Sequence, residues 1–65
     1  MIETITKIVI ELQNQGLRLS QITLPVGLHR RLSFELIGEA GFITMFLGIP
    51  IESTQMEFMR LDFAP

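Results

Sequence analysis

Apolar residues occupy both faces of a stretch in the second half of the chain. Residues 42–51 read Phe-Ile-Thr-Met-Phe-Leu-Gly-Ile-Pro-Ile, with one polar side chain and no charge. A strand of a small soluble domain normally alternates apolar and polar residues, because one face meets the core and the other meets water. The stretch therefore predicts a strand, bent or interrupted at Gly48-Ile49-Pro50, whose second face needs a cover that so short a chain can barely supply.

A helix is predicted over residues 2–15. Its apolar residues follow the i, i+3, i+4, i+7 spacing of a single helical stripe. Gly16 suits the left-handed position that follows many helix ends, with Leu17 placed for the hydrophobic contact after it. Residues 4–10 are rich in β-branched side chains, which lowers helix propensity. A strand over 4–10 therefore stays an alternative.

A second helix is predicted over residues 26–39, directly after Pro25, since proline is favoured at helix starts. Leucines recur on one side of this helix at four-residue intervals: Leu28, Leu32 and Leu36. Phe34 and Ile37 lie on the opposite side, where a helix of a monomer needs no apolar residue.

Strands are further predicted over residues 19–24 and 56–63, with the polar residues 52–55 as a tight link between antiparallel neighbours. The expected fold is α+β, in the order α-β-α-β-β, as one domain over residues 1–65. We expect a mixed sheet of about three strands with both helices on one face. The other face would then carry an apolar patch: Phe42, Phe46, Met56 and Phe58.

Composition favours association. A domain of 65 residues is marginally stable as a monomer, and small domains usually add disulfides, a metal or a partner subunit. The chain has no cysteine and a single histidine, so disulfides and ordinary zinc sites are excluded. Apolar residues make up 48% of the chain and charged residues 18%, below the average of about a quarter. We therefore expect a homo-oligomer or a tight subunit.

Charge and hydropathy exclude some partners. The net charge of −2 argues against broad affinity for nucleic acid. The apolar run over residues 41–51 is too short to span a bilayer, and the N-terminus lacks the pattern of a signal peptide. We expect a soluble cytoplasmic protein, in the host cytoplasm if it is viral.

The polar feature most suited to binding is His29-Arg30-Arg31, near the start of the second predicted helix. Three potential cations within one turn could hold a phosphate or carboxylate. They could equally be solvated or contact a neighbouring subunit, because arginine is enriched at interfaces. Ser33 lies four residues after His29, but catalysis needs a third group that orients the base. We expect no enzymatic activity, no cofactor and no metal.

One family resemblance rests on the order of elements and on a few segments: Gly16-Leu17, Ile22-Thr23-Leu24-Pro25, Leu28, Leu32 and Phe46-Leu47-Gly48-Ile49-Pro50-Ile51. These resemble the peripheral (axial) domain of capsid proteins of tailed phages with the HK97-type fold. The chain lacks the long spine helix and extended loop of that family and is several times shorter. The resemblance implies a phage-related origin and a domain that packs around a symmetry axis, and it carries over no functional residue.

The function predicted from the sequence is that of a non-enzymatic structural or interaction protein, encoded by a phage, that self-associates through apolar sheet and helix faces. Phe34 and Ile37 are its predicted helix contacts. One alternative is a binder of small anionic, nucleotide-like molecules, with Arg30 and Arg31 in an inter-subunit pocket. Another is an inhibitor that docks on a host enzyme. The expected partners are further copies of the chain, or a host or virion protein.

Overall fold

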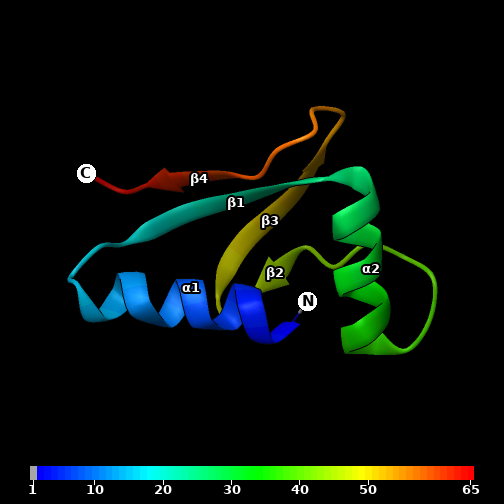
Figure 1. The fold of residues 1–65 in the computed structure, drawn as a ribbon, viewed down its shortest axis with the longest axis horizontal. Helices are drawn as coiled ribbons and strands as arrows, with labels where there is room; N and C mark the ends of the chain where they lie inside the picture. Colours follow the sequence, from blue (N-terminus) through cyan, green and yellow to red (C-terminus); the bar gives the residue numbers. More distant parts are fainter. Residues whose placement is uncertain (1) are drawn as a thin grey trace.

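The computed structural model describes residues 2–65 and shows an α+β fold with two helices and a four-stranded mixed sheet (Figure 1). The elements are α1 (Ile2–Asn14), β1 (Leu19–Pro25), α2 (Val26–Ile37), β2 (Met45–Phe46), β3 (Ile49–Thr54) and β4 (Arg60–Phe63). The predicted fold class is confirmed, and the sheet has one strand more than expected.

The strands lie in the order β2-β3-β1-β4. β1 and β3 are parallel and are connected through α2, whereas β4 pairs antiparallel with β1 and β2 antiparallel with β3. The predicted tight link at residues 52–55 is wrong, because β1 lies between β3 and β4. Residues 52–54 instead belong to β3, where their backbone pairs with residues 23–25 of β1 whatever the polarity of their side chains.

The extra strand arises within the stretch predicted as one bent strand over residues 42–51. β2 and β3 form a hairpin in which Phe46 pairs with Ile49, so Leu47 and Gly48 are the two loop residues. Both have positive φ, 52° and 78°. That combination is typical of the type I′ turn, whose twist matches the twist of paired strands. The stretch is therefore interrupted, at Leu47-Gly48, by a tight turn that reverses the chain.

The helix ends follow the expected chemistry. The N–H of Leu17 bonds to the carbonyl of Leu12 and the N–H of Gly16 to that of Gln13, at 3.0 Å each, and Gly16 has a φ of 83°. These are the paired bonds of a Schellman motif, which confirms the predicted stop. The alternative strand over residues 4–10 is wrong. α2 ends at Ile37, two residues earlier than predicted, before the left-handed Gly38.

The core lies between the two helices and one face of the sheet. Its buried apolar members come from both helices and from β1, β2 and β3: Ile5, Val9, Ile22, Leu24, Leu32, Phe46, Ile49 and Ile51. Phe46, predicted at an interface, is 5% exposed, so that prediction is wrong. The hairpin turn directs Phe46 inward beside Ile49, where it fills the core.

The leucine stripe of α2 is only partly buried. Leu32 is fully buried, whereas Leu28 and Leu36 are 37% and 44% exposed. The buried side of α2 also carries His29 and Ser33, at 3% and 0% exposure. Polar side chains can occupy this side because each of them finds hydrogen-bond partners there.

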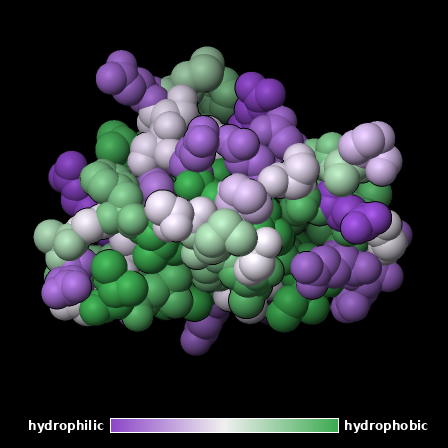
Figure 2. Space-filling model, turned by 180° about the vertical axis from the view of Figure 1, so that it is seen from behind, coloured by the Kyte–Doolittle hydropathy of each residue, from purple (hydrophilic) through white to green (hydrophobic). Residues whose placement is uncertain are grey.

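The opposite face of the sheet lacks the predicted apolar patch: β1 and β4 carry polar side chains there, whereas Met45 of β2 is apolar and 52% exposed. Gln21 and Thr23 alternate with the buried residues of β1, and the register sets Asp62 and Arg60 beside them. The side-chain amide of Gln21 donates to Glu52 at 3.1 Å, and Arg60 pairs with Asp62 at 3.0 Å. Figure 2, which views the molecule from behind, shows hydrophilic side chains across the upper middle and hydrophobic ones over much of the lower half.

Candidate functional site

The predicted cation cluster is divided between two sides of α2. His29 is 3% exposed and faces the sheet, whereas Arg30 and Arg31 are exposed. Successive residues of a helix point about 100° apart, so a run of three cannot share one direction. The structure therefore keeps Arg30 and Arg31 as candidates for anion binding and removes His29 from that group.

His29 is held through both nitrogens of its ring. Nε2 lies 2.8 Å from the carbonyl oxygen of Ile43, and Nδ1 lies 2.5 Å from the hydroxyl oxygen of Ser53. A carbonyl can only accept, so Nε2 carries a proton and donates it to Ile43. Nδ1 and the hydroxyl of Ser53 form the second hydrogen bond of the ring. The ring thus connects α2 to β3 and to the segment before β2.

Ser33 completes the network from the same side of α2. Its hydroxyl donates to the carbonyl of His29 at 2.7 Å and accepts the backbone N–H of Ile43 at 3.0 Å. Ser33 lies four residues after His29 but does not bond to its imidazole, and Ser53 takes that place. Ser53 was missed in the sequence because its partner is 24 residues away and belongs to another element.

A serine bonded to a histidine whose second nitrogen is oriented by an acceptor has the layout of a nucleophile and its base. In this protein the ring is buried, and the acceptor on its second nitrogen is the backbone carbonyl of Ile43 rather than a carboxylate. The two surface hollows described below also lie away from Ser53. The arrangement is suited to holding α2 against the sheet, which is a structural role.

Phe42 lies between His29 and Arg30. Its ring centroid is 5.0 Å from that of His29, with the ring planes tilted by 60°, and the guanidinium carbon of Arg30 lies 5.8 Å from it. These distances fit an aromatic pair and a cation–π contact. Phe42, predicted at an interface on the sheet, instead belongs to the segment between α2 and β2 and keeps 46% of its surface exposed.

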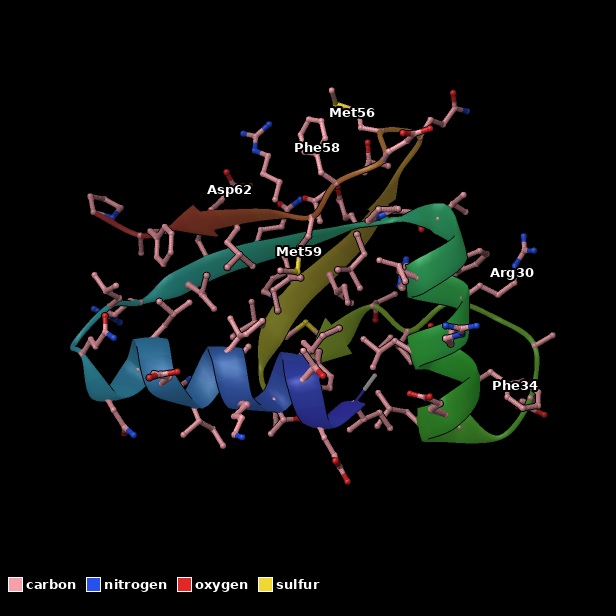
Figure 3. All side chains as sticks on the ribbon, viewed as in Figure 1. Arg30, Phe34, Met56, Phe58, Met59 and Asp62 are labelled. Atoms are coloured by element: carbon pink, nitrogen blue, oxygen red, sulfur yellow. The ribbon has the colours of Figure 1, made fainter. Side chains whose placement is uncertain are left out.

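A hollow of about 510 Å³ runs along the outer side of α2. It is lined by Gly27, Arg30, Arg31, Phe34, Glu35 and Ala40. Figure 3 shows Arg30 and Phe34 both pointing away from the sheet. The hollow combines two guanidinium groups with an exposed aromatic ring. That combination suits an anion that carries a flat apolar group.

The predicted interface residues do not form one surface. Phe34 and Ile37 are 57% and 50% exposed and lie one turn apart on α2; we name them the α2 patch. Met56 and Phe58 are 58% and 60% exposed and lie in the segment between β3 and β4. Figure 3 shows this pair far from Phe34, at the other side of the molecule. The single patch predicted for the sheet is therefore wrong.

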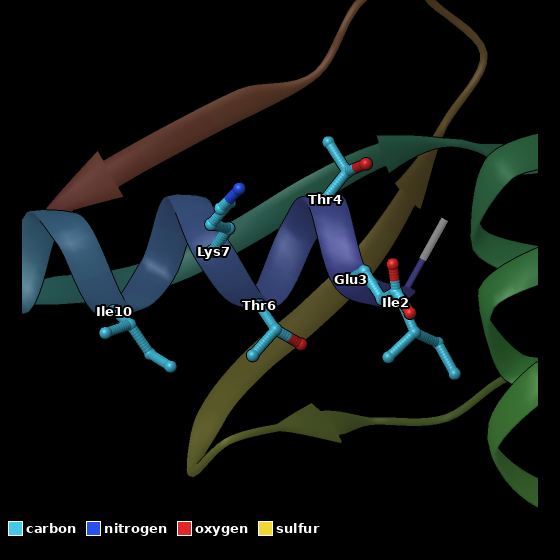
Figure 4. A pocket seen from close by; sticks show the side chains of 6 residues that line it. All are labelled: Ile2, Glu3, Thr4, Thr6, Lys7 and Ile10. Carbon is cyan, nitrogen blue, oxygen red and sulfur yellow. The ribbon is translucent and has the colours of Figure 1, made fainter.

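A second hollow, of about 530 Å³, lies over α1 (Figure 4). Its lining residues all come from that helix: Ile2, Glu3, Thr4, Thr6, Lys7 and Ile10. A hollow with one wall encloses little of a ligand, because binding sites usually bury most of a ligand's surface. It is a weaker candidate than the hollow along α2.

Comparisons with known proteins give no relative for this chain: no family model, no curated protein and no solved structure matches it. Within residues 2–65, neither helix has the length and apolar character needed to cross a bilayer. In the same part of the chain, no three side chains of the His, Asp and Glu types gather where they could hold a metal ion. The proposed function therefore depends on the geometry of the described residues and on the sequence itself.

Proposed function

We propose that this protein is a small non-enzymatic interaction protein that self-associates, and that the α2 patch is one of its contact surfaces. The observation that carries the proposal is the exposure of Phe34 and Ile37, at 57% and 50%, on the side of α2 turned away from the core. A monomer gains nothing from large apolar side chains in water, whereas an interface buries them.

Composition supports the same proposal. The chain has 48% apolar and 18% charged residues, so few charged side chains surround the exposed apolar ones. Aromatic residues and arginine are enriched in interfaces, and Arg30 and Arg31 lie beside Phe34 in one hollow. The part of the sheet face over β1 and β4 is excluded from this proposal, because charged and amide side chains cover it.

We extend the proposal to the setting that the sequence resemblance implies, a phage-encoded subunit or accessory protein in the host cytoplasm that packs around a symmetry axis. An isologous contact through the α2 patch fits such a role, because the same surface is used on both copies.

Phe34→Glu tests the contact through α2. A carboxylate in place of the ring would have to be buried without a partner, so the molar mass measured by light scattering should fall. Ile10→Glu is the matched control, since Ile10 is a 47% exposed apolar residue on α1. An unchanged molar mass for Phe34→Glu, or an equal fall for Ile10→Glu, would remove the α2 patch from the interface.

A second candidate function is the binding of a small anionic molecule in the hollow along α2. The observation in its favour is that Arg30, Arg31 and Phe34 line the same hollow. Adenosine triphosphate offers phosphates to the guanidinium groups and a flat base to the ring. A ligand that binds only the folded state raises the melting temperature.

The nucleotide and inorganic phosphate are the probes for this second function. We expect a higher melting temperature with the nucleotide, lost in Arg30→Ala/Arg31→Ala and kept in Arg18→Ala. No shift with either probe would reject the second function. A stable monomer that still binds a host enzyme would favour the third function, that of a docking inhibitor.

A further inference from the structure

β4 forms an open edge of the sheet. It pairs with β1 on one side, and it is the last strand in the order β2-β3-β1-β4. Among residues 2–65, Figure 1 shows no helix or strand beyond it. The backbone groups on that side are available to a further strand, which is how edge strands recruit partners. The opposite edge, β2, has only two residues and offers little to pair with.

The direction of the backbone groups in β4 follows from one hydrogen bond. The N–H of Ala64 donates to the carbonyl of Arg18 at 2.8 Å, so the backbone N–H and C=O of residue 64 point toward the β1 side. The direction of these groups alternates along a strand, and the N–H and C=O of residues 62 and 60 therefore also point toward β1. Leu61 and Phe63 point their N–H and C=O groups outward, to the free edge.

The side chains around Leu61 form a self-complementary pattern. Arg60 and Asp62 flank it with opposite charges on the polar face of the sheet, and Met59 and Phe63 flank these with apolar side chains. When β4 pairs antiparallel with β4 of a second copy, the two Leu61 residues lie opposite each other. Each other residue then faces the partner residue that lies equally far from Leu61 in the opposite direction. Arg60 then faces Asp62 of the partner subunit.

We propose that two copies of this chain pair edge to edge through β4, antiparallel, around a two-fold axis at Leu61. The inference rests on the proposed self-association and names one of its contacts. The two Leu61 residues exchange both of their backbone N–H···O bonds, because their outward groups meet at the axis. Arg60 and Asp62 of the partner subunit occupy the adjacent non-hydrogen-bonded position, where side chains approach most closely.

The charges select both the register and the kind of partner. A register centred on Asp62 would oppose two carboxylates, and one centred on Arg60 would oppose two guanidinium groups, which is destabilising. Like charges on an edge strand protect it from pairing with its own copy. This edge instead carries one charge of each sign, Arg60 and Asp62, which are paired at 3.0 Å within one strand. A second copy of the strand therefore brings an opposite charge to each of them.

Contacts between apolar side chains add to the pairing of the two β4 strands. Phe63 is 46% exposed, and in the proposed register Met59 of the partner subunit lies opposite it. Figure 3 places Asp62 and Phe34 far apart, so contacts through β4 and through the α2 patch do not compete. Both contacts together would build assemblies larger than a dimer.

Amide hydrogen exchange followed by nuclear magnetic resonance tests the backbone part of the proposal. The amides of Leu61 and Phe63 should become protected as the protein concentration rises. Those of Arg60 and Asp62 should be protected at every concentration, because they bond to β1 within one chain. Leu61 and Phe63 amides that exchange equally fast at all concentrations, in a protein whose molar mass rises, would overturn the β4 contact alone.

Charge reversal tests the register. Arg60→Glu and Asp62→Lys should each weaken dimerisation about tenfold or more, since by symmetry each creates two repulsive cross-strand pairs. The double variant Arg60→Glu/Asp62→Lys restores opposite charges and should recover the dimer. Lys7→Glu/Glu11→Lys repeats the exchange on exposed positions of α1 and is the control.

The results separate the two proposals. A wild-type chain that is monomeric at every concentration rejects the proposed function, and this inference with it. Self-association that neither single variant weakens, or a double variant no better than the single ones, rejects only the pairing through β4. Circular dichroism spectra identical to wild type show that each variant is folded.

Discussion

The hydroxyl of Ser53 is hydrogen-bonded to Nδ1 of His29 across 24 positions of the chain, and this bond joins the end of β3 to the first turns of α2. The other ring nitrogen of His29 bonds to the carbonyl of Ile43. α2 is thus held against the sheet by hydrogen bonds as well as by apolar contacts. The helix presents the α2 patch from the opposite side, so this network sets the orientation of the proposed contact surface.

Ser33→Ala should lower the free energy of unfolding by about 1–3 kcal/mol, because the N–H of Ile43 loses its partner at a partly buried position. Ser53→Ala should cost less, about 0.5–1.5 kcal/mol, since Ser53 is exposed and water can replace it. Urea denaturation at a fixed protein concentration measures both. Ser20→Ala, at an exposed position of β1, is the control, and a Ser33 variant as stable as this control would show that the network adds no stability.

Leu32→Ala should lower the free energy of unfolding by about 2–5 kcal/mol, because Leu32 is fully buried and its removal leaves a cavity. In a domain of this size each kcal/mol corresponds to about 4–8 °C in melting temperature. Leu36→Ala is the matched control on the same helix, at 44% exposure, and should change stability far less. Equal losses for the two variants would contradict the described orientation of α2.

The sequence predicted the helices and the fold class well because those signals are local. The apolar stripe of α1 and the glycine after it are read within one segment, and the Schellman bonds at Gly16 confirm that interpretation. The strand order could not be predicted from such local signals. Whether residues 52–55 form a hairpin depends on where β1 lies, and that is decided by pairing between distant segments.

The candidate site shows the same division. Exposure of Phe34 and Ile37 follows from their helical phase relative to Leu32, which spacing alone reveals. The burial of His29 does not, because it depends on Ser53 and on the carbonyl of Ile43 in other elements. Phe46 was misassigned for a related reason: in a stretch with apolar residues on both faces, alternation does not say which face is inside.

The β2–β3 turn offers a test of local strain. Leu47 has a φ of 52°, which leucine adopts only at a cost, whereas asparagine is favoured there in a type I′ turn. Leu47→Asn should therefore raise the free energy of unfolding by about 0.5–1 kcal/mol.

Gly48→Ala is the opposite change in the same turn. It should lower the free energy of unfolding by about 1 kcal/mol, because alanine is strained at the positive φ of residue 48. No steric clash adds to this cost, since nothing lies within 4 Å of an added Cβ. Thermal unfolding measures both variants. A Leu47→Asn variant less stable than wild type would mean that the leucine side chain is used in a contact.

Sedimentation equilibrium of the unaltered chain over a wide concentration range shows whether the protein self-associates. We expect a weight-average mass that rises with concentration above the 7.4 kDa of one chain, toward a dimer or a larger assembly. A mass that stays at 7.4 kDa throughout, with the protein folded, would contradict it.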